Sequence, residues 1–183
     1  SGFVGEDTST SNDVTGSANC TTTATSTSPV GIYPINCTVS TLSSNNYLFN
    51  NFIAGKLNII YKFNGFSQPI NDINYQPNQN QSVFKAGSTI PVKLQIKKSD
   101  GTAVQATDTP IWLNPQKGSA MSASVDESVY NLSTTSGTIY KWDSSSNQYV
   151  YNWSTKGLAS GYWYKIFAKL DDGKIYSVVV GLR

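Results

Sequence analysis

The stretch that most constrains the fold is VFKAGSTIPVKLQI, which runs from Val83 to Ile96. Residues 86–88 supply a flexible corner, and from there apolar and polar residues alternate one by one. The apolar positions are Ile90, Val92, Leu94 and Ile96. This period of two predicts a strand with one buried face and one wet face. Pro91 has no N–H to donate, so we expect it at the first positions of the strand, at an edge or at a bulge.

The rest of the sequence continues in the same β pattern, and no segment of useful length has a helical period. After this strand, the pattern predicts strands over residues 110–113, 138–142, 148–153, 162–170 and 174–182, with residues 114–137 undecided. Strands 138–142 and 148–153 are expected to form a hairpin through residues 143–147, and the last two strands a hairpin through Asp171-Asp172-Gly173. Short strands with turns every 8 to 12 residues or so favour a β-sandwich over a barrel of long strands.

The first third of the chain predicts a smaller β module. Residues 1–19 are small and polar, as in a loop or tail, and strands are expected over residues 20–26, 32–40, 46–49 and 56–61. Residues 62–81 are rich in Asn, Gln and Pro and are expected to be a connector, with the apolar segment 63–66 held against the next domain. We therefore expect two domains in an all-β chain, divided at residues 1–62 and 63–183.

The chain contains two cysteines, Cys20 and Cys37, and no histidine. No CxxC spacing indicates a zinc or redox site, which leaves a structural disulfide or two free buried thiols. If Cys20 faces Cys37 across an antiparallel pair, Ala24 faces Tyr33 and residues 27–30 form a four-residue connection. The register and the turn agree, so we expect a disulfide that contributes about 3 kcal/mol.

Composition excludes several partners and favours an extracellular setting. Thirteen Lys and Arg stand against eleven Asp and Glu without a charge run, so neither nucleic acid nor an anionic membrane is indicated. The polar residues of the chain are mainly Ser, Thr and Asn, and the chain also contains 11 Tyr and 4 Trp. This composition is common in extracellular or cell-surface β-proteins. No apolar run has the roughly 20 residues of a membrane span, and no signal pattern opens the sequence. Any signal or anchor is expected outside this chain.

The N-terminal part resembles a known family at specific stretches. A glycine-led entry, SGFVGEDT, is followed by CTTTATSTSPVGIYPINC and by LSSNNYLFNNFIAGKLNI. This order is similar to MBG domains, repeated bacterial and archaeal surface modules with a mostly-β, β-grasp-like fold, over about residues 1–60. In that family a strand precedes the segment that Gly2-Phe3-Val4 matches. The resemblance therefore implies a partial module that lacks its first strand.

The C-terminal part resembles a second family over about residues 63–183. The stretches FNGFSQPIN, VFKAGSTIPVKLQI, YKWDSSSNQYVYNW and KGLASGYWYKIFAKLDDGK are similar to PxKF-type domains at the C-terminal ends of surface and secreted proteins. The family's Pro-x-Lys-Phe element stands here as Pro91-Val92-Lys93-Leu94, in which Leu keeps the last position apolar. The resemblance implies an immunoglobulin-like β-sandwich.

Catalytic, metal and cofactor sites are not indicated by the sequence. Histidine-dependent triads are excluded, and no phosphate-binding loop occurs. The acidic pairs Asp126-Glu127 and Asp171-Asp172 could serve a glycosidase or hold calcium, but the second pair lies in a turn where Asp is expected for backbone reasons. We expect no enzyme activity and no cofactor.

Aromatic residues and sequons are the remaining candidate sites. Alternation over residues 162–170 places Trp163 and Phe167 on the face opposite Tyr164, and with Trp153 they are candidates for ligand or subunit contacts, core packing being the alternative. Candidate glycosylation sites are the five sequon residues Asn19, Asn36, Asn80, Asn131 and Asn152. Their number is about what chance predicts for this composition.

Two functions remain open from the sequence. The first is a non-catalytic structural module of an extracellular surface protein or filament, in which an incomplete sheet takes up a strand from a neighbouring copy or from another surface protein. The second is a carbohydrate-binding module of a larger secreted enzyme, with glycans as partners.

Overall fold

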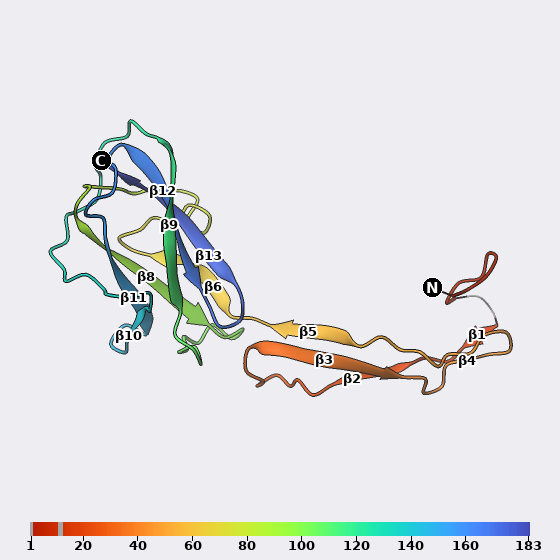
Figure 1. The fold of residues 1–183 in the computed structure, drawn as a ribbon. Helices are drawn as coiled ribbons and strands as arrows, with labels where there is room; N and C mark the ends of the chain where they lie inside the picture. The colour runs from red at the N-terminus through yellow and green to blue at the C-terminus, as the bar shows by residue number, and fades with distance from the viewer. Residues whose placement is uncertain (1, 11–12) are drawn as a thin grey trace. The chain divides into compact units, whose positions relative to one another are not determined.

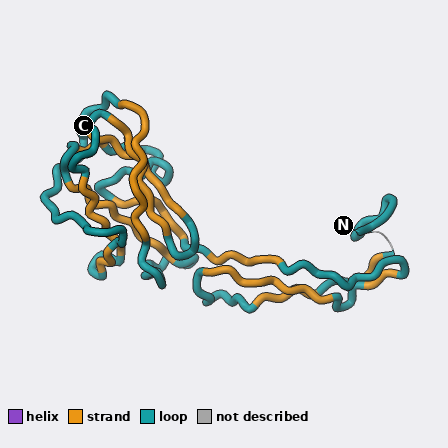
Figure 2. Tube along the Cα trace, in the orientation of Figure 1, coloured by secondary structure: helices purple, strands orange, loops and turns teal. Residues whose placement is uncertain are grey.

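The computed structural model describes residues 2–10 and 13–183, and in this part of the chain every regular element is a β-strand (Figures 1 and 2). None of these residues forms a helix that could cross a membrane. The chain divides into two compact units, an N-terminal unit (Ser1–Ile60) and a C-terminal unit (Tyr61–Arg183). The prediction of an all-β chain is confirmed.

The C-terminal unit contains two four-stranded sheets (Figure 1). The first has the spatial order β10 (Lys141–Asp143), β11 (Gln148–Ser154), β8 (Thr89–Lys97) and β6 (Lys62–Ser67). The second has the order β7 (Val83–Phe84), β13 (Ile175–Leu182), β12 (Tyr162–Lys169) and β9 (Ile111–Ala120). Neighbouring strands are antiparallel except β7 and β13, which are parallel.

Strand β8 lies between β11 and β6 and has the alternation that the sequence predicts. Its apolar positions Ile90, Val92, Leu94 and Ile96 are fully buried. Pro91 pairs with Asn152 of β11, whereas β6 pairs only with the later part of β8, from Lys93 onward. Pro91 is the third residue of β8, and no residue of β6 lies opposite it. Its missing N–H therefore costs no backbone hydrogen bond between β8 and β6.

Aromatic rings join the two sheets in a buried core. Trp112 of β9 stacks on Tyr151 of β11 with ring centroids 4.5 Å apart, and Trp153 of β11 contacts Tyr164 of β12 at 6.2 Å. All four side chains are less than a tenth exposed. The two sheets thus bury one face each against the other, which is the arrangement of a β-sandwich.

Two expectations for the C-terminal unit are corrected. Residues 62–67, expected in a connector, form β6, because Phe63 and Phe66 bury their rings in the core at 8% and 1% exposure. Strand β9 extends to Ala120, well beyond the predicted 110–113, because it pairs along β12 despite an irregular apolar pattern. The hairpins β10–β11 and β12–β13 confirm the predicted pairs.

The N-terminal unit contains a three-stranded sheet and a small two-stranded one (Figure 1). The larger has the order β2 (Asn19–Thr22), β3 (Gly31–Thr38) and β5 (Gly55–Ile59), all antiparallel. The smaller pairs β1 (Val14–Thr15) with β4 (Ser43–Ser44). Segment 1–19, expected to be a loop or tail, thus includes β1 and the first residue of β2, while residues 1 and 11–12 lie outside the described part.

Two strand predictions for the N-terminal unit are wrong in extent. Strand β2 ends at Thr22 rather than at residue 26, so the expected pairing of Ala24 with Tyr33 does not form. Residues 46–49 form no strand, because the hydroxyl of Ser44 accepts the backbone N–H groups of Asn46 and Tyr47 at 3.1 and 3.2 Å and turns the chain.

The hydroxyl of Tyr140 gives a test of the sandwich core. Tyr140 is 1% exposed and its oxygen has no hydrogen-bond partner among the described residues, whereas the hydroxyl of Tyr151 donates to the carbonyl of Gly137 at 2.7 Å. We predict that Tyr140→Phe raises the free energy of unfolding by up to about 1 kcal/mol, and that Tyr151→Phe lowers it by about 1 kcal/mol. Urea titrations of both variants measure this, and equal losses would contradict it.

Tyr61 gives the C-terminal unit a defined alkaline sensitivity. Its hydroxyl donates to Asp171 at 3.4 Å, and burial together with this carboxylate raises the pKa of Tyr61 to about 12. The folded chain therefore holds this proton more tightly than the unfolded chain, whose tyrosine titrates near 10.

We predict that the Tyr61 contribution to stability is intact below about pH 10 and is lost as the pH rises to about 12. Thermal unfolding over this range should show a steeper loss for the parent than for Tyr61→Phe, which cannot ionise. Parallel curves would show that Tyr61 does not carry the effect.

Candidate functional site

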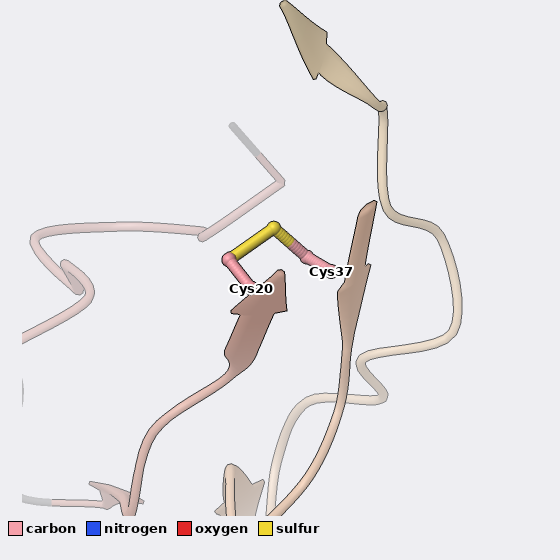
Figure 3. The surroundings of a disulfide bond; sticks show 2 residues. All are labelled: Cys20 and Cys37. Atoms are coloured by element: carbon pink, nitrogen blue, oxygen red, sulfur yellow. A yellow bond between two sulfur atoms is a disulfide. The ribbon is translucent and has the colours of Figure 1, made fainter. Parts of the chain in front are cut away.

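The three-stranded sheet of the N-terminal unit is fastened by a disulfide bond between its first two strands (Figure 3). Cys20 of β2 and Cys37 of β3 are directly opposite each other, with Cα atoms 4.0 Å apart. The predicted bridge and its register are confirmed, and both cysteines are accounted for.

The close approach of the two cysteines shows in which direction each backbone group points. A cross-strand Cα separation this short is typical of a pair that exchanges no backbone hydrogen bonds. Cys37 therefore directs its N–H and C=O toward β5, and Cys20 directs its own away from the sheet. Because directions alternate along a strand, Thr22 also points outward from β2.

Pro34 supports the same assignment and explains where β2 ends. Pro34 pairs with Lys56 of β5, and a proline fits an antiparallel ladder only where it need not donate. Its nitrogen therefore faces β2, where the next hydrogen-bonded pair after Thr21 and Asn36 would require an N–H from residue 34. The ladder between β2 and β3 stops before that pair.

Both outer edges of this sheet have unpaired backbone groups. The residues of β5 that pair with Tyr33 and Ile35 direct their backbone N–H and C=O groups toward β3. Because these directions alternate along a strand, the N–H and C=O groups of Lys56 and Asn58 point away from the sheet. No strand in the described ranges pairs with the outer side of β2 or of β5. An open edge of this kind is a ready template for pairing with another chain.

The faces of the sheet are uncovered as well. Strand β3 alternates strictly between half-buried and exposed residues, as a strand with one apolar face does. The half-buried face carries Tyr33 and Ile35, beside Leu57 and Ile59 of β5. Yet no described residue of the N-terminal unit is buried, and every core residue belongs to the C-terminal unit. Within the described residues of the N-terminal unit, no second layer covers the apolar face of this sheet.

Single exposed apolar side chains add to this picture. Ile32 on the other face of β3 is 67% exposed, and Leu48 and Ile53, in the chain before β5, are 83% and 90% exposed. Isolated exposed apolar residues are ordinary on protein surfaces, but a whole unit without a buried residue is not. Among the described residues of this unit, apolar side chains thus stay uncovered and both edges of the sheet stay unpaired.

Acidic side chains in this unit hold loops in place. The hydroxyl of Tyr47 donates to Asp7 at 2.7 Å, and this bond is the main reason that the pKa of Tyr47 is raised. Asp13 accepts from the side chains of Ser44 and Asn46 at 3.2 and 3.0 Å. These carboxylates are occupied by structural hydrogen bonds.

The acidic pairs that the sequence singles out have structural partners in the C-terminal unit. Asp126 accepts the N–H of Val83 at 2.7 Å, and Glu127 accepts the hydroxyl of Ser82 at 2.8 Å. Asp172 accepts the N–H of Tyr61 at 3.0 Å. Within the described residues, no three acidic or cysteine side chains gather as a metal site would require.

A buried carboxylate that sequence reasoning did not find lies after β6. Asp72 is fully buried and accepts the N–H groups of Phe66 and Asn74 at 3.0 and 3.3 Å. Burial raises the pKa of Asp72, and the two hydrogen bonds oppose that shift. Its role is to close the turn that follows β6.

The three aromatic candidates are not brought together. Trp153 is 4% exposed within the core, so it offers no surface to a ligand or a subunit. Trp163 and Phe167 are half-buried on the outer face of the other sheet, away from the rings that join the two sheets. Trp163 lines a groove on this face.

The sequon asparagines differ in exposure. Asn19, Asn36, Asn80 and Asn131 are exposed. Asn152 is half-buried, and its amide nitrogen, the atom that would carry a glycan, donates to the carbonyl of Ser133 at 2.9 Å. Asn152 is therefore the poorest of the five candidate acceptors.

Comparison with known proteins gives one finding, which concerns the N-terminal unit. Residues 1–58 match the family model of the MBG domain (YGX type). The match supports the resemblance to MBG-type repeats and covers 58 of the 183 residues. Searches of curated proteins and of solved structures gave no significant match. The resemblance of residues 63–183 to PxKF-type domains stays a prediction.

The disulfide should carry much of the stability of the N-terminal unit, because none of the described residues of this unit is buried. We predict that replacing both Cys20 and Cys37 by Ser lowers the unfolding free energy of this unit by about 3 kcal/mol and leaves the C-terminal unit unchanged. Hydrogen exchange followed by mass spectrometry resolves the two units in the intact chain. Unchanged protection of β2 and β3 in the variant would contradict the prediction.

Proposed function

We propose that this chain is a non-catalytic structural module of an extracellular cell-surface protein or filament, in which the N-terminal sheet takes up a strand from a neighbouring copy. The observation that carries the proposal is a disulfide-fastened sheet with two unpaired edges and no buried residue among those described. A single layer of this kind is marginal alone, and an added strand supplies both ladder partners and apolar cover.

Three features support an extracellular setting. Disulfides persist in oxidising compartments and are rare in the cytosol. The match of residues 1–58 is to a domain of MBG type, which the sequence resemblance associates with surface proteins. The surface is polar mainly through Ser, Thr and Asn rather than through charge.

The C-terminal unit suits the role of a stable carrier for the N-terminal sheet. Its two sheets cover each other and form a buried aromatic core. We assign it to residues 63–183 as an immunoglobulin-like domain of PxKF type and assign residues 1–62 to the MBG-like module. Asp126, Glu127 and Asp172 are used in hydrogen bonds of the fold, which favours a structural role over catalysis.

Of the two open edges, β5 is the better acceptor. It is one residue longer than β2, and Leu57 and Ile59 accompany its backbone with apolar side chains. An incoming strand beside β5 extends the ladder at Lys56 and Asn58 and also covers part of this apolar face. Strand β2 has only Cys20 and small polar side chains to offer.

Proline substitutions test this proposal by removing single outward-pointing N–H groups. We predict that Asn58→Pro abolishes association between copies, because it removes a donor that faces the open edge but not the ladder to β3. Thr22→Pro is the matched control, since it removes an outward donor from the opposite edge and should leave association intact. Sedimentation velocity at increasing protein concentration measures the assembly state of each.

Three outcomes would overturn parts of the proposal. A parent protein that stays monomeric at high concentration excludes assembly through this sheet. Loss of association with Thr22→Pro but not with Asn58→Pro assigns the exchange to β2. Strong protection of the Lys56 and Asn58 amides from hydrogen exchange in the dilute monomer would show that a strand of the same polypeptide already pairs with the outer edge of β5.

A further inference from the structure

A groove in the C-terminal unit lies on the outer face of the sheet that contains β9, β12 and β13, the face turned away from the core. It has a volume of about 380 Å³. Its lining consists of two lysines, two glutamines and four other residues: Gln81, Gln116, Lys117, Gly118, Ser119, Trp163, Lys165 and Val179. This size lies at the lower end of the range for small-ligand sites.

A β-bulge shapes the groove beside Trp163. The pairing of β12 with β9 shifts between Tyr162 and Tyr164, so Gly118 and Ser119 both stand opposite Trp163. A Cβ atom at residue 118 would lie 3.3 Å from the carbonyl oxygen of Trp163 and 3.7 Å from its Cβ. A side chain at this position would therefore press against the backbone of Trp163, and bulges of this kind are frequent beside functional sites.

A row of three residues across the sheet continues the lining. Lys165 of β12 pairs with Gln116 of β9 on one side and with Val179 of β13 on the other. Trp163 lies two residues before Lys165 and therefore on the same face. The groove thus combines an indole and a valine with an amide and an ammonium group, and Gln81 adds a second amide.

Both charged residues that line the groove are positive. Its lining contains no Asp or Glu, and Lys165 is an exposed residue whose ammonium lies 5.7 Å from the ring of Phe167. The other lysine, Lys117, has its ammonium 3.5 Å from the centre of the Tyr162 ring. The C-terminal unit as a whole has twelve Lys and Arg against eight Asp and Glu, which favours an anionic ligand.

We infer that this groove binds an acidic saccharide of a neighbouring surface glycan. A sugar ring stacks its C–H face on the indole of Trp163, and its hydroxyls exchange hydrogen bonds with the amides of Gln81 and Gln116. Its carboxylate or sulfate pairs with Lys165 through a charge-assisted hydrogen bond. The inference does not depend on strand exchange by the N-terminal unit, since all lining residues lie in the C-terminal unit.

A glycan array probed with the full chain is the first test. We predict binding to glycans that carry uronic acid, sialic acid or sulfate, in preference to neutral glycans. Trigalacturonic acid and its fully methyl-esterified form then compare one saccharide with and without its charge in calorimetric titrations. Absence of binding to every acidic glycan on the array overturns the inference.

Matched variants on the same face locate the site. Trp163→Ala should weaken binding of a positive glycan at least ten-fold, and Lys165→Gln should weaken binding of the acidic form about ten-fold while leaving the neutral ester unchanged. Lys169→Gln alters a lysine on the same face of the strand but outside the groove, and it should change affinity less than two-fold.

The outcomes separate the remaining explanations. Circular dichroism and melting temperature of each variant exclude a loss that is due to unfolding. Equal losses of glycan affinity in the groove variants and in the Lys169→Gln control overturn the assignment of the binding site to the groove, because the loss is then not specific to the groove residues. If no glycan binds and Trp163→Ala lowers self-association instead, the occupant of the groove is a second copy of this chain, and the inference is wrong.

Discussion

The stacking of Trp112 on Tyr151 across the two sheets of the C-terminal unit is the contact on which that unit depends. A β-strand always has two faces, and an apolar face contributes to stability only when something covers it. Rings from β9, β11 and β12 meet between the sheets and exclude water from both inner faces. Once these faces are closed, the outer faces are free to carry polar residues and a groove.

The N-terminal unit obeys the same rule with a different result. Its strands alternate as those of the sandwich do, but no second sheet in the described residues covers their apolar face. The disulfide between Cys20 and Cys37 limits the unfolded chain where packing cannot stabilise the folded one. A unit stabilised in this way keeps its shape while its edges and one face stay available for a partner, which is what strand uptake requires.

Sequence patterns predicted the strands best where alternation is strong and turns are marked. The buried face of β8, the disulfide and the last two hairpins follow directly from residues 90–97, from the cysteine spacing and from the turns at residues 143–147 and 171–173. Strand β6 was missed because Asn64 and Gly65 interrupt its apolar pattern and because Asn, Gln and Pro follow it. Such a composition is typical of connectors, and only the two buried phenylalanines reveal the strand.

The candidate site was harder to predict for a physical reason. Motif searches look for side chains, whereas the open edge consists of backbone N–H and C=O groups that every residue type has. The direction of these groups depends on the register, and the register depends on the pairing of Cys20 with Cys37 and on Pro34, which cannot donate. Trp163 was recognised as a candidate, but its groove also depends on a bulge at Gly118 and Ser119 that alternation alone does not show. In both units the proposed functional surfaces lie where the regular pattern of the sheet is interrupted, at an unpaired edge and at a bulge. An edge of unpaired backbone groups and a groove beside a bulge both depend on pairing between strands that are distant in the sequence, so no local side-chain motif records them.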